Sequence, residues 1–430
     1  MTNWATDDVR LAAAITAARG REPASAAQFD ELVARAIWGV LVEPGDTEAG
    51  ALIAAIGAVE AAKLMISGAS ATRLREAADG GIARGGEGRA QRRWSTRLRS
   101  DDVVRSLERA GQVGARMLVP GDDEWPTMLD DLGTGAPVLL WVQGDARLLH
   151  RPAIAMVGAR AATGYGEHVA MEFAAGLVAR DAAIVSGGAY GIDGMAHRAA
   201  LASGGTTLAV LAGGVDRLYP SGHEALLRRI AQQGVLVSET PCGTSPTKWR
   251  FLQRNRVIAA LAHATVVVEA GYRSGALNTA HHAQTIGRPL GVVPGPITSA
   301  SSAGCHRMLR DENAHCVTSV ADIMQLAFGT DRVLALPGFD ATPIAATAQA
   351  QGAARSTEHA APESSLETRV LDAVRPRRGQ SADEVARAAG ESPESVRAVL
   401  GVLALDGRVQ FGDDGLWRSI QRPRQAREPR

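Results

Sequence analysis

Six short apolar runs, each followed by a segment with helical spacing, constrain the fold of this chain more than any other feature. The runs are AIAMVG, AAIVSGG, TTLAVLAGG, GVLVSE, ATVVVEA and PLGVVPG, and they are separated by 15 to 30 residues. This alternation is typical of βαβ units, in which helices link parallel strands and cover both faces of the sheet. The sequence therefore predicts an α/β core with a parallel sheet over residues 111 to 330.

Residues 1 to 110 differ from this core. They are rich in Ala and Leu, contain few β-branched runs, and show helical spacing in ELVARAIWGVLV and AGALIAAIGAVEAAKLMI. We therefore expect a small helical domain at the N-terminus.

The chain beyond residue 330 divides into three parts. Residues 331 to 364 are mostly small and polar without periodicity, so they cannot bury enough surface to offset their ordering entropy, and we expect a disordered linker. Residues 365 to 420 carry three helical segments, a capping box at Ser381 and Glu384, and the hairpin pattern RVQF and GLWR. This pattern predicts a winged helix-turn-helix, followed by a basic tail over 421 to 430.

Charge and cysteine content limit the partners and the compartment. The chain has 46 basic and 46 acidic residues, so a polyanion site must be a local concentration of charge. Its cysteines, Cys242, Cys305 and Cys316, are too few and too scattered for a disulfide framework, which suits a reducing compartment. No apolar run approaches the roughly 20 residues of a membrane span, and acids stand where a signal peptide has a basic start. We expect a cytoplasmic protein without membrane contact.

Glycines follow the predicted strands repeatedly. They are Gly158, Gly187 and Gly188, Gly213 and Gly214, and Gly275. In parallel sheets such turns lead into helix N-termini, whose free N–H groups attract anions, and glycine lets a ligand approach the backbone closely. The dinucleotide pattern GxGxxG fits poorly at VGARAATGYG and a Walker A motif is absent, so four glycine turns suggest a ligand longer than a mononucleotide.

The segment KWRFLQRNR, residues 248 to 256, combines cations with aromatic rings. It contains four basic residues, no acid, and Trp249 and Phe251. Basic side chains neutralise phosphates and an exposed ring offers a base a stacking surface, a combination that favours single strands. An amphipathic helix with Phe251, Leu252 and Val257 in the core and the arginines in solvent explains the same residues equally well.

Together these motifs resemble a known family. VGAR, SGGAYGIDGMAH, LAGGVDRLYP, SETPCGTSPTKWRFLQRNRVIAAL, VVVEAGYRSGALNTAHHA and GRPLGVVPGP match, in order and spacing, the DNA-processing protein A family (DprA, also called Smf) over residues 120 to 315. The resemblance implies an extended Rossmann-like domain that binds single-stranded DNA, forms a homodimer, and passes the strand to the RecA recombinase in natural transformation. The N-terminal helical (SAM-like) domain and the winged helix are similar to appendages found in that family.

The resemblance also assigns site residues. It implies that Arg160 of VGAR and Lys248 of KWRF contact phosphates and that Phe251 contacts a base. The expected nucleic-acid-binding set is Gly158, Ala159, Arg160, Gly187, Gly188, Lys248, Phe251, Arg254, Asn255, Arg256 and Gly275. Gly187 and Gly188 would line the pocket, and Arg254 to Arg256 would start the helix that closes it. The chain departs from the family at Leu252, which replaces a proline, and at His306, which replaces an asparagine.

Two alternatives belong to other functional classes. Asp193, His197, Glu239 and Glu269 could form an acid–base set, as in a Rossmann-like phosphoribohydrolase, but the PGGxGTxxE signature of that group is absent. Asp193 at a helix start is more simply a partner of free N–H groups. The winged helix could also belong to a transcription regulator, although its third helix has few exposed basic residues. We expect no enzyme activity, no cofactor and no metal.

Overall fold

The computed structural model describes residues 9–83, 86–329, 366–375, 378–405, 407–412 and 414–420. The predicted linker, 331–364, and the predicted tail, 421–430, lie outside these residues. A nine-stranded sheet with the order β1-β2-β6-β5-β4-β3-β7-β8-β9 forms the centre of the molecule. Its strands are β1 (Arg116–Leu118), β2 (Leu140–Gly144), β3 (Ala153–Gly158), β4 (Ala183–Ser186), β5 (Thr207–Leu211), β6 (Val235–Ser238), β7 (Ala264–Glu269), β8 (Leu290–Val292) and β9 (His315–Cys316).

The six predicted strands are β3 to β8, and each is parallel to its neighbours among them. The predicted Rossmann-like sheet is thus confirmed. The sequence did not reveal β1 and β2, which extend the sheet by antiparallel pairing, or the two-residue strand β9. From β3 the chain order runs one way through β4, β5 and β6 and the other way through β7 and β8. Such a switch point opens a crevice beyond the carboxyl ends of β3 and β7.

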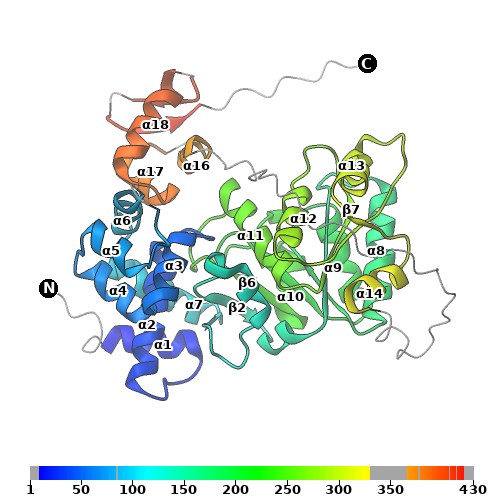
Figure 1. Cartoon of the computed structure of the whole chain (residues 1–430), viewed down its shortest axis with the longest axis horizontal. Helices are drawn as coiled ribbons and strands as arrows, with labels where there is room; N and C mark the ends of the chain where they lie inside the picture. Colours follow the sequence, from blue (N-terminus) through cyan, green and yellow to red (C-terminus); the bar gives the residue numbers. More distant parts are fainter. Residues whose placement is uncertain are drawn as a thin grey trace.

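Helices cover both faces of the sheet (Figure 1). One face packs against α11 (Lys248–Ala260), α12 (Ala276–Thr285) and α13 (Ala303–Asp311). The other face packs against α8 (Gly164–Val178), α9 (Ile192–Ala202) and α14 (Val320–Phe328). All strand residues of β3, β4, β5 and β7 except Gly158 are buried, because both faces are covered.

The N-terminal helices share a core with the sheet. They are α1 (Val9–Arg19), α2 (Ala26–Leu41), α3 (Thr47–Ile56), α4 (Ala58–Ile66), α5 (Ala71–Ala77), α6 (Glu87–Ser95) and α7 (Ser100–Gln112). Their buried side chains form one continuous cluster with residues of β5, β6 and α10 (Glu224–Gln233). No single described helix is long and apolar enough to cross a membrane, although α3 and α4 together, bent by 112°, would meet that criterion by length and composition.

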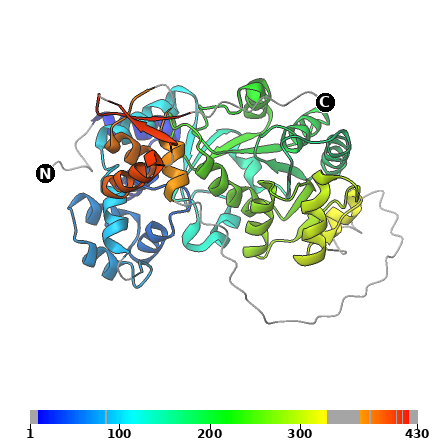
Figure 2. The same ribbon diagram turned by 90° about the horizontal axis from the view of Figure 1, so that it is seen from above.

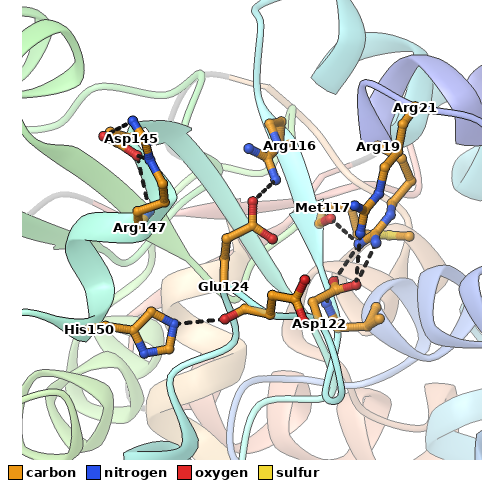
Figure 3. Close-up of polar contacts among 11 residues, drawn as sticks. Arg19, Arg21, Arg116, Met117, Asp122, Glu124, Asp145, Arg147 and His150 are labelled. Carbon is orange, nitrogen blue, oxygen red and sulfur yellow. Dashed lines mark hydrogen bonds and ion pairs between the residues drawn. The ribbon is translucent and has the colours of Figure 1, made fainter.

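Polar contacts also join α1 to the first strands (Figure 3). Arg19 is buried, donates to the carbonyl oxygen of Met117 at 2.7 Å, and forms an ion pair with Asp122 in the loop after β1. In the same loop, Glu124 accepts from Arg116 at 2.8 Å. The C-terminal end of α1 is therefore tied to the antiparallel edge of the sheet.

The winged helix consists of α16 (Leu366–Ala373), α17 (Ala382–Ala389), α18 (Pro393–Leu405), and the antiparallel strands β10 (Val409–Phe411) and β11 (Trp417–Ser419). The capping box predicted at Ser381 and Glu384 begins α17. This domain lies over the N-terminal helices and the first turn of α11 (Figure 2). Its own small core is built from residues of α16, α17, α18 and β10.

Candidate nucleic-acid interface

A cavity of about 1060 Å³ opens at the switch point, between the loop after β3, the loop after β7 and helix α11. Such crevices are the usual ligand sites of open parallel sheets. Eight of the eleven residues predicted to bind nucleic acid line it, namely Gly158, Ala159, Arg160, Lys248, Phe251, Arg254, Asn255 and Gly275. The cavity thus brings together residues that are up to 117 positions apart in the sequence.

Two cations face the solvent from separate elements of this cavity. Arg160 follows β3, and Lys248 is the first residue of α11; both side chains are exposed. The hydroxyl of Thr247 accepts from the N–H of Arg250 at 3.2 Å, which caps α11 and fixes the position of Lys248 in its first turn. Exposed cations around a cavity provide the charge that a phosphate backbone requires.

An aromatic ring lies between cationic groups. Phe251 is half-buried, and the guanidinium carbons of Arg160 and Arg254 lie 5.3 Å and 5.8 Å from its ring centroid. Tyr219 contacts the same ring with a centroid distance of 5.6 Å. The cavity therefore presents an aromatic cluster next to positive charge, as base stacking on a single strand requires.

The buried pair of Arg254 and Asp193 forms the floor of the cavity. Arg254 donates to the carbonyl oxygen of Gly187 at 2.7 Å and to that of Val210, which ties the ends of β4 and β5 together. Burial lowers the pKa of Arg254 to about 10. Burial also raises the pKa of Asp193, despite the nearby Arg254 and N–H donors from Gly187 and Ala189.

This arrangement corrects the prediction for Gly187 and Gly188. Both residues are buried and do not line the cavity. The Arg254 guanidinium covers Gly187, where a Cβ atom would lie 2.4 Å from it. The N–H of Gly187 donates to Asp193 at 3.0 Å, so this amide has a partner within the protein. The SGG turn thus lies beneath Arg254 and supports the lining of the cavity without being part of it.

Arg256 is also not at the cavity surface. Its side chain is 5% exposed and forms an ion pair with Glu239 at 2.5 Å. Burial raises the pKa of Glu239, and Arg256 opposes that shift. The helix that begins at Lys248 thus exposes its first residue and buries its later arginines, because Arg250, Arg254 and Arg256 each face an internal acid or carbonyl.

A buried carboxylate anchors α11 to the N-terminal helices. Glu43, in the loop after α2, accepts from Arg250 at 2.7 Å and 2.9 Å and pairs with Arg97, which follows α6. Burial alone would raise the pKa of Glu43, but the guanidinium groups of Arg250 and Arg97 lower it to about 2. The carboxylate is therefore ionised and fixes the first turn of α11 in place.

The residues of the alternative acid–base set have separate roles. His197 contacts the Thr207 hydroxyl through Nδ1 at 2.7 Å rather than Asp193, and burial lowers its pKa to about 3. Glu269 accepts from the N–H and hydroxyl of Thr163 at 2.8 Å and 2.9 Å. Within the described residues, no hydrogen bond joins any two members of the set, and no group of three or more His, Cys, Asp or Glu side chains is placed to hold a metal ion.

Among the lining residues that the sequence did not predict, two aromatic residues and one cation are well exposed. Tyr219 and Tyr272 are 51% and 63% exposed, and Arg273 is exposed next to Tyr272. They lie in LAGGVDRLYP and EAGYRSG, two of the glycine-containing turns that the sequence predicts at strand ends. The tyrosines in these turns were the sequence feature that could have identified them as lining residues.

The chain is similar to known proteins over most of its length. Residues 116–328 match the family model described as DNA recombination-mediator protein A, and residues 354–415 match the DprA winged helix domain. A protein of Mycobacterium tuberculosis described as a DNA processing protein DprA is 42% identical over 393 residues, which cover 89% of this chain and 92% of that protein.

Two findings from Streptococcus pneumoniae extend the comparison. Its DNA processing protein DprA is 40% identical over 203 residues, covering 47% of this chain and 71% of that protein. The X-ray structure of DprA from this organism superimposes with a TM-score of 0.55 at 28% identity, covering 69% of this chain and 96% of that one. The chain described here therefore belongs to the DNA-processing protein A family, also known as DprA or Smf.

Proposed function

We propose that this protein binds single-stranded DNA in the cavity at the switch point, protects the incoming strand, and loads the RecA recombinase onto it during transformation and recombination. One observation carries the proposal: the exposed cations Arg160 and Lys248 line a single cavity together with the Phe251 and Tyr219 rings. Cations next to stacking surfaces suit the phosphates and unpaired bases of a single strand. Duplex DNA keeps its bases stacked and offers them to such a surface only at its ends.

We also propose that the protein is cytoplasmic and has no enzyme activity. Two carboxylates near the cavity are engaged internally, Asp193 by amides and Glu239 by Arg256. The winged helix gives less support to a transcription regulator, because Arg397 on α18 is paired with Asp383 at 2.9 Å. We further propose that a homodimer presents two strands to RecA.

The test is fluorescence anisotropy with a labelled oligothymidylate and a duplex of equal length across a salt series. Arg160→Ala and Lys248→Ala should each weaken single-strand binding and reduce the salt slope by about one. Arg228→Ala is the matched control, since Arg228 is exposed on α10, away from the cavity. Equal affinities for the three variants and the wild type would contradict the proposed site.

RecA loading is tested separately. RecA filament assembly on an oligonucleotide coated with single-strand-binding protein should accelerate when the wild type is added. The Arg160→Ala, Lys248→Ala double variant should not accelerate it, because it cannot hold the strand. Strand binding without any effect on assembly would remove RecA loading from the proposal and leave strand binding intact.

A further inference from the structure

The winged helix places a carboxylate at the edge of the cavity. Asp372 of α16 lines the cavity together with Lys248. It faces the ammonium group of Lys248 and the backbone N–H groups of Lys248 and Trp249, at the first turn of α11. Asp372 is nevertheless exposed on its remaining side. An anionic group thus stands where a strand contacting Lys248 would place a phosphate.

A second contact holds α16 against the same turn of α11. The guanidinium carbon of Arg369 lies 5.0 Å from the centroid of the Trp249 ring, a cation–π contact. Arg369 also forms an ion pair with the buried Glu391 inside the winged helix. The contact therefore connects the internal structure of the winged helix to α11.

The base of the docked domain rests on the buried charge cluster. Arg97 donates to the carbonyl oxygens of Arg387 and Ala388 at 2.8 Å and 3.4 Å, at the C-terminal end of α17. A cation at this end of a helix is favourable, because the last carbonyl groups carry partial negative charge. Arg97 shares Glu43 with Arg250 of α11, so one carboxylate links the docking point to the helix that carries Lys248.

The carboxyl groups of Asp372 and Glu43 differ in the direction in which their surroundings shift the pKa. Burial raises the pKa of Asp372, and the attraction of Lys248 and the two N–H groups only partly offsets this. Its carboxylate thus gains less from its surroundings than it loses in hydration. A DNA phosphate at the same place would bring neighbouring phosphates toward Arg160, a contact that Asp372 cannot provide.

We propose that the winged-helix domain is an internal competitor of the DNA strand, in which Asp372 takes the place of a phosphate beside Lys248. Strand entry then requires α16 to leave the first turn of α11. A ligand shifts such an equilibrium by its different affinity for the two states, so the docked domain lowers the apparent affinity for DNA. This inference rests on the proposed function, since it concerns the regulation of that same site.

The first experiment compares Asp372→Asn with Asp383→Asn in the full chain. Both substitutions remove one exposed negative charge from the winged helix, but Asp383 pairs with Arg397 outside the cavity. We expect Asp372→Asn to bind labelled oligothymidylate about three- to tenfold more tightly than the wild type. Asp383→Asn should bind as the wild type does. Equal affinities for both variants and the wild type would overturn the inference.

The second experiment follows the domain itself by hydrogen exchange. In the wild type, saturating oligothymidylate should speed exchange of the amides of Leu366–Ala373 while slowing exchange near Arg160. Asp372→Lys should speed exchange of α16 without DNA, because Lys248 then repels it. If DNA protects the Arg160 region and leaves the exchange of α16 unchanged, the inference that α16 competes with the strand is wrong. If the wild type and Asp372→Asn both fail to bind DNA, the proposed function fails, and the inference fails with it.

Discussion

Arg160 lies over the ring of Phe251, with its guanidinium carbon 5.3 Å from the ring centroid, although the two residues come from the loop after β3 and from α11. The cation and the ring therefore form one unit across the cavity. In the proposed complex with DNA, a base stacked on Phe251 would share the ring with Arg160, which would bring a phosphate contact and a base contact within one nucleotide.

Replacing the ring should weaken strand binding without affecting the charge. Phe251→Leu keeps an apolar side chain in the half-buried position but removes the stacking surface, and we expect a loss of about 1–3 kcal/mol in binding. Fluorescence anisotropy with a labelled oligothymidylate measures this loss in binding free energy. Phe411→Leu is the control, since that ring is 59% exposed on β10 and outside the cavity. An unchanged salt slope with a lower affinity would support base contact, whereas an unchanged affinity would exclude it.

The buried carboxylate of Glu43 should control stability. Glu43→Gln leaves Arg97 and Arg250 buried without their anion, which should lower the free energy of unfolding by about 3–5 kcal/mol. Urea unfolding at neutral pH measures the change. A loss below about 1 kcal/mol would show that the two arginines find other partners.

The same carboxylate predicts a pH dependence. The pKa of Glu43 falls from 4.5 to about 2 on folding, so its contribution to stability is complete above 4.5 and is lost as the pH falls toward 2. Wild-type stability should therefore decrease over this interval. Glu43→Gln should show a smaller decrease over it, and an equal decrease in both proteins would assign the effect to other groups.

Arg256 should affect stability but not the salt dependence of binding. Arg256→Met leaves Glu239 buried without its cation, and we expect a loss of about 3–5 kcal/mol in unfolding free energy. The salt slope for oligothymidylate should match that of the wild type, because Arg256 does not line the cavity. Arg310→Met, at an exposed pair with Asp311, should leave the unfolding free energy essentially unchanged, because a solvent-screened pair contributes little. If Arg256→Met reduced the salt slope, Arg256 would have to contact the DNA, contrary to this prediction.

Asp193→Asn separates a structural role from a catalytic one. The amide oxygen can still accept from Gly187 and Ala189, but Arg254 loses its counter-charge, so unfolding free energy should fall by about 1–3 kcal/mol. Single-strand affinity should not decrease, since the change removes a negative charge from the cavity. Nucleotide hydrolysis by the wild type that disappears in this variant would instead favour the phosphoribohydrolase alternative.

The parts of the fold that depend on local patterns could be predicted from the sequence. The six apolar runs are β3 to β8, and Ser381 with Glu384 begins α17 as expected. The antiparallel pairing of β2 with β6 was not predictable in this way, because the two strands are far apart in the sequence and β2 lacks a βαβ partner.

The site shows the same division between local and distant information. Arg160, Lys248 and Phe251 were expected to meet, and the structure places all three around one cavity. KWRFLQRNR contains four cations, but Arg250 faces Glu43, which lies 207 positions away. Charge in a sequence segment does not reveal which cations find internal partners, and burial here depends on those partners.

The continuous core of the N-terminal helices and the sheet has a consequence for how this family can diversify. Buried side chains of α1 to α7 belong to the same apolar cluster as Leu211, Leu227 and Ile230, so these helices form part of the wall behind the sheet. A relative that lost this segment would have to acquire polar replacements on that wall or a new cover for it. Residues of α1 to α7 and of the surface that they pack against must therefore change together. Transfer of these helices from one homologue to another would require matched substitutions in the helices and on that surface.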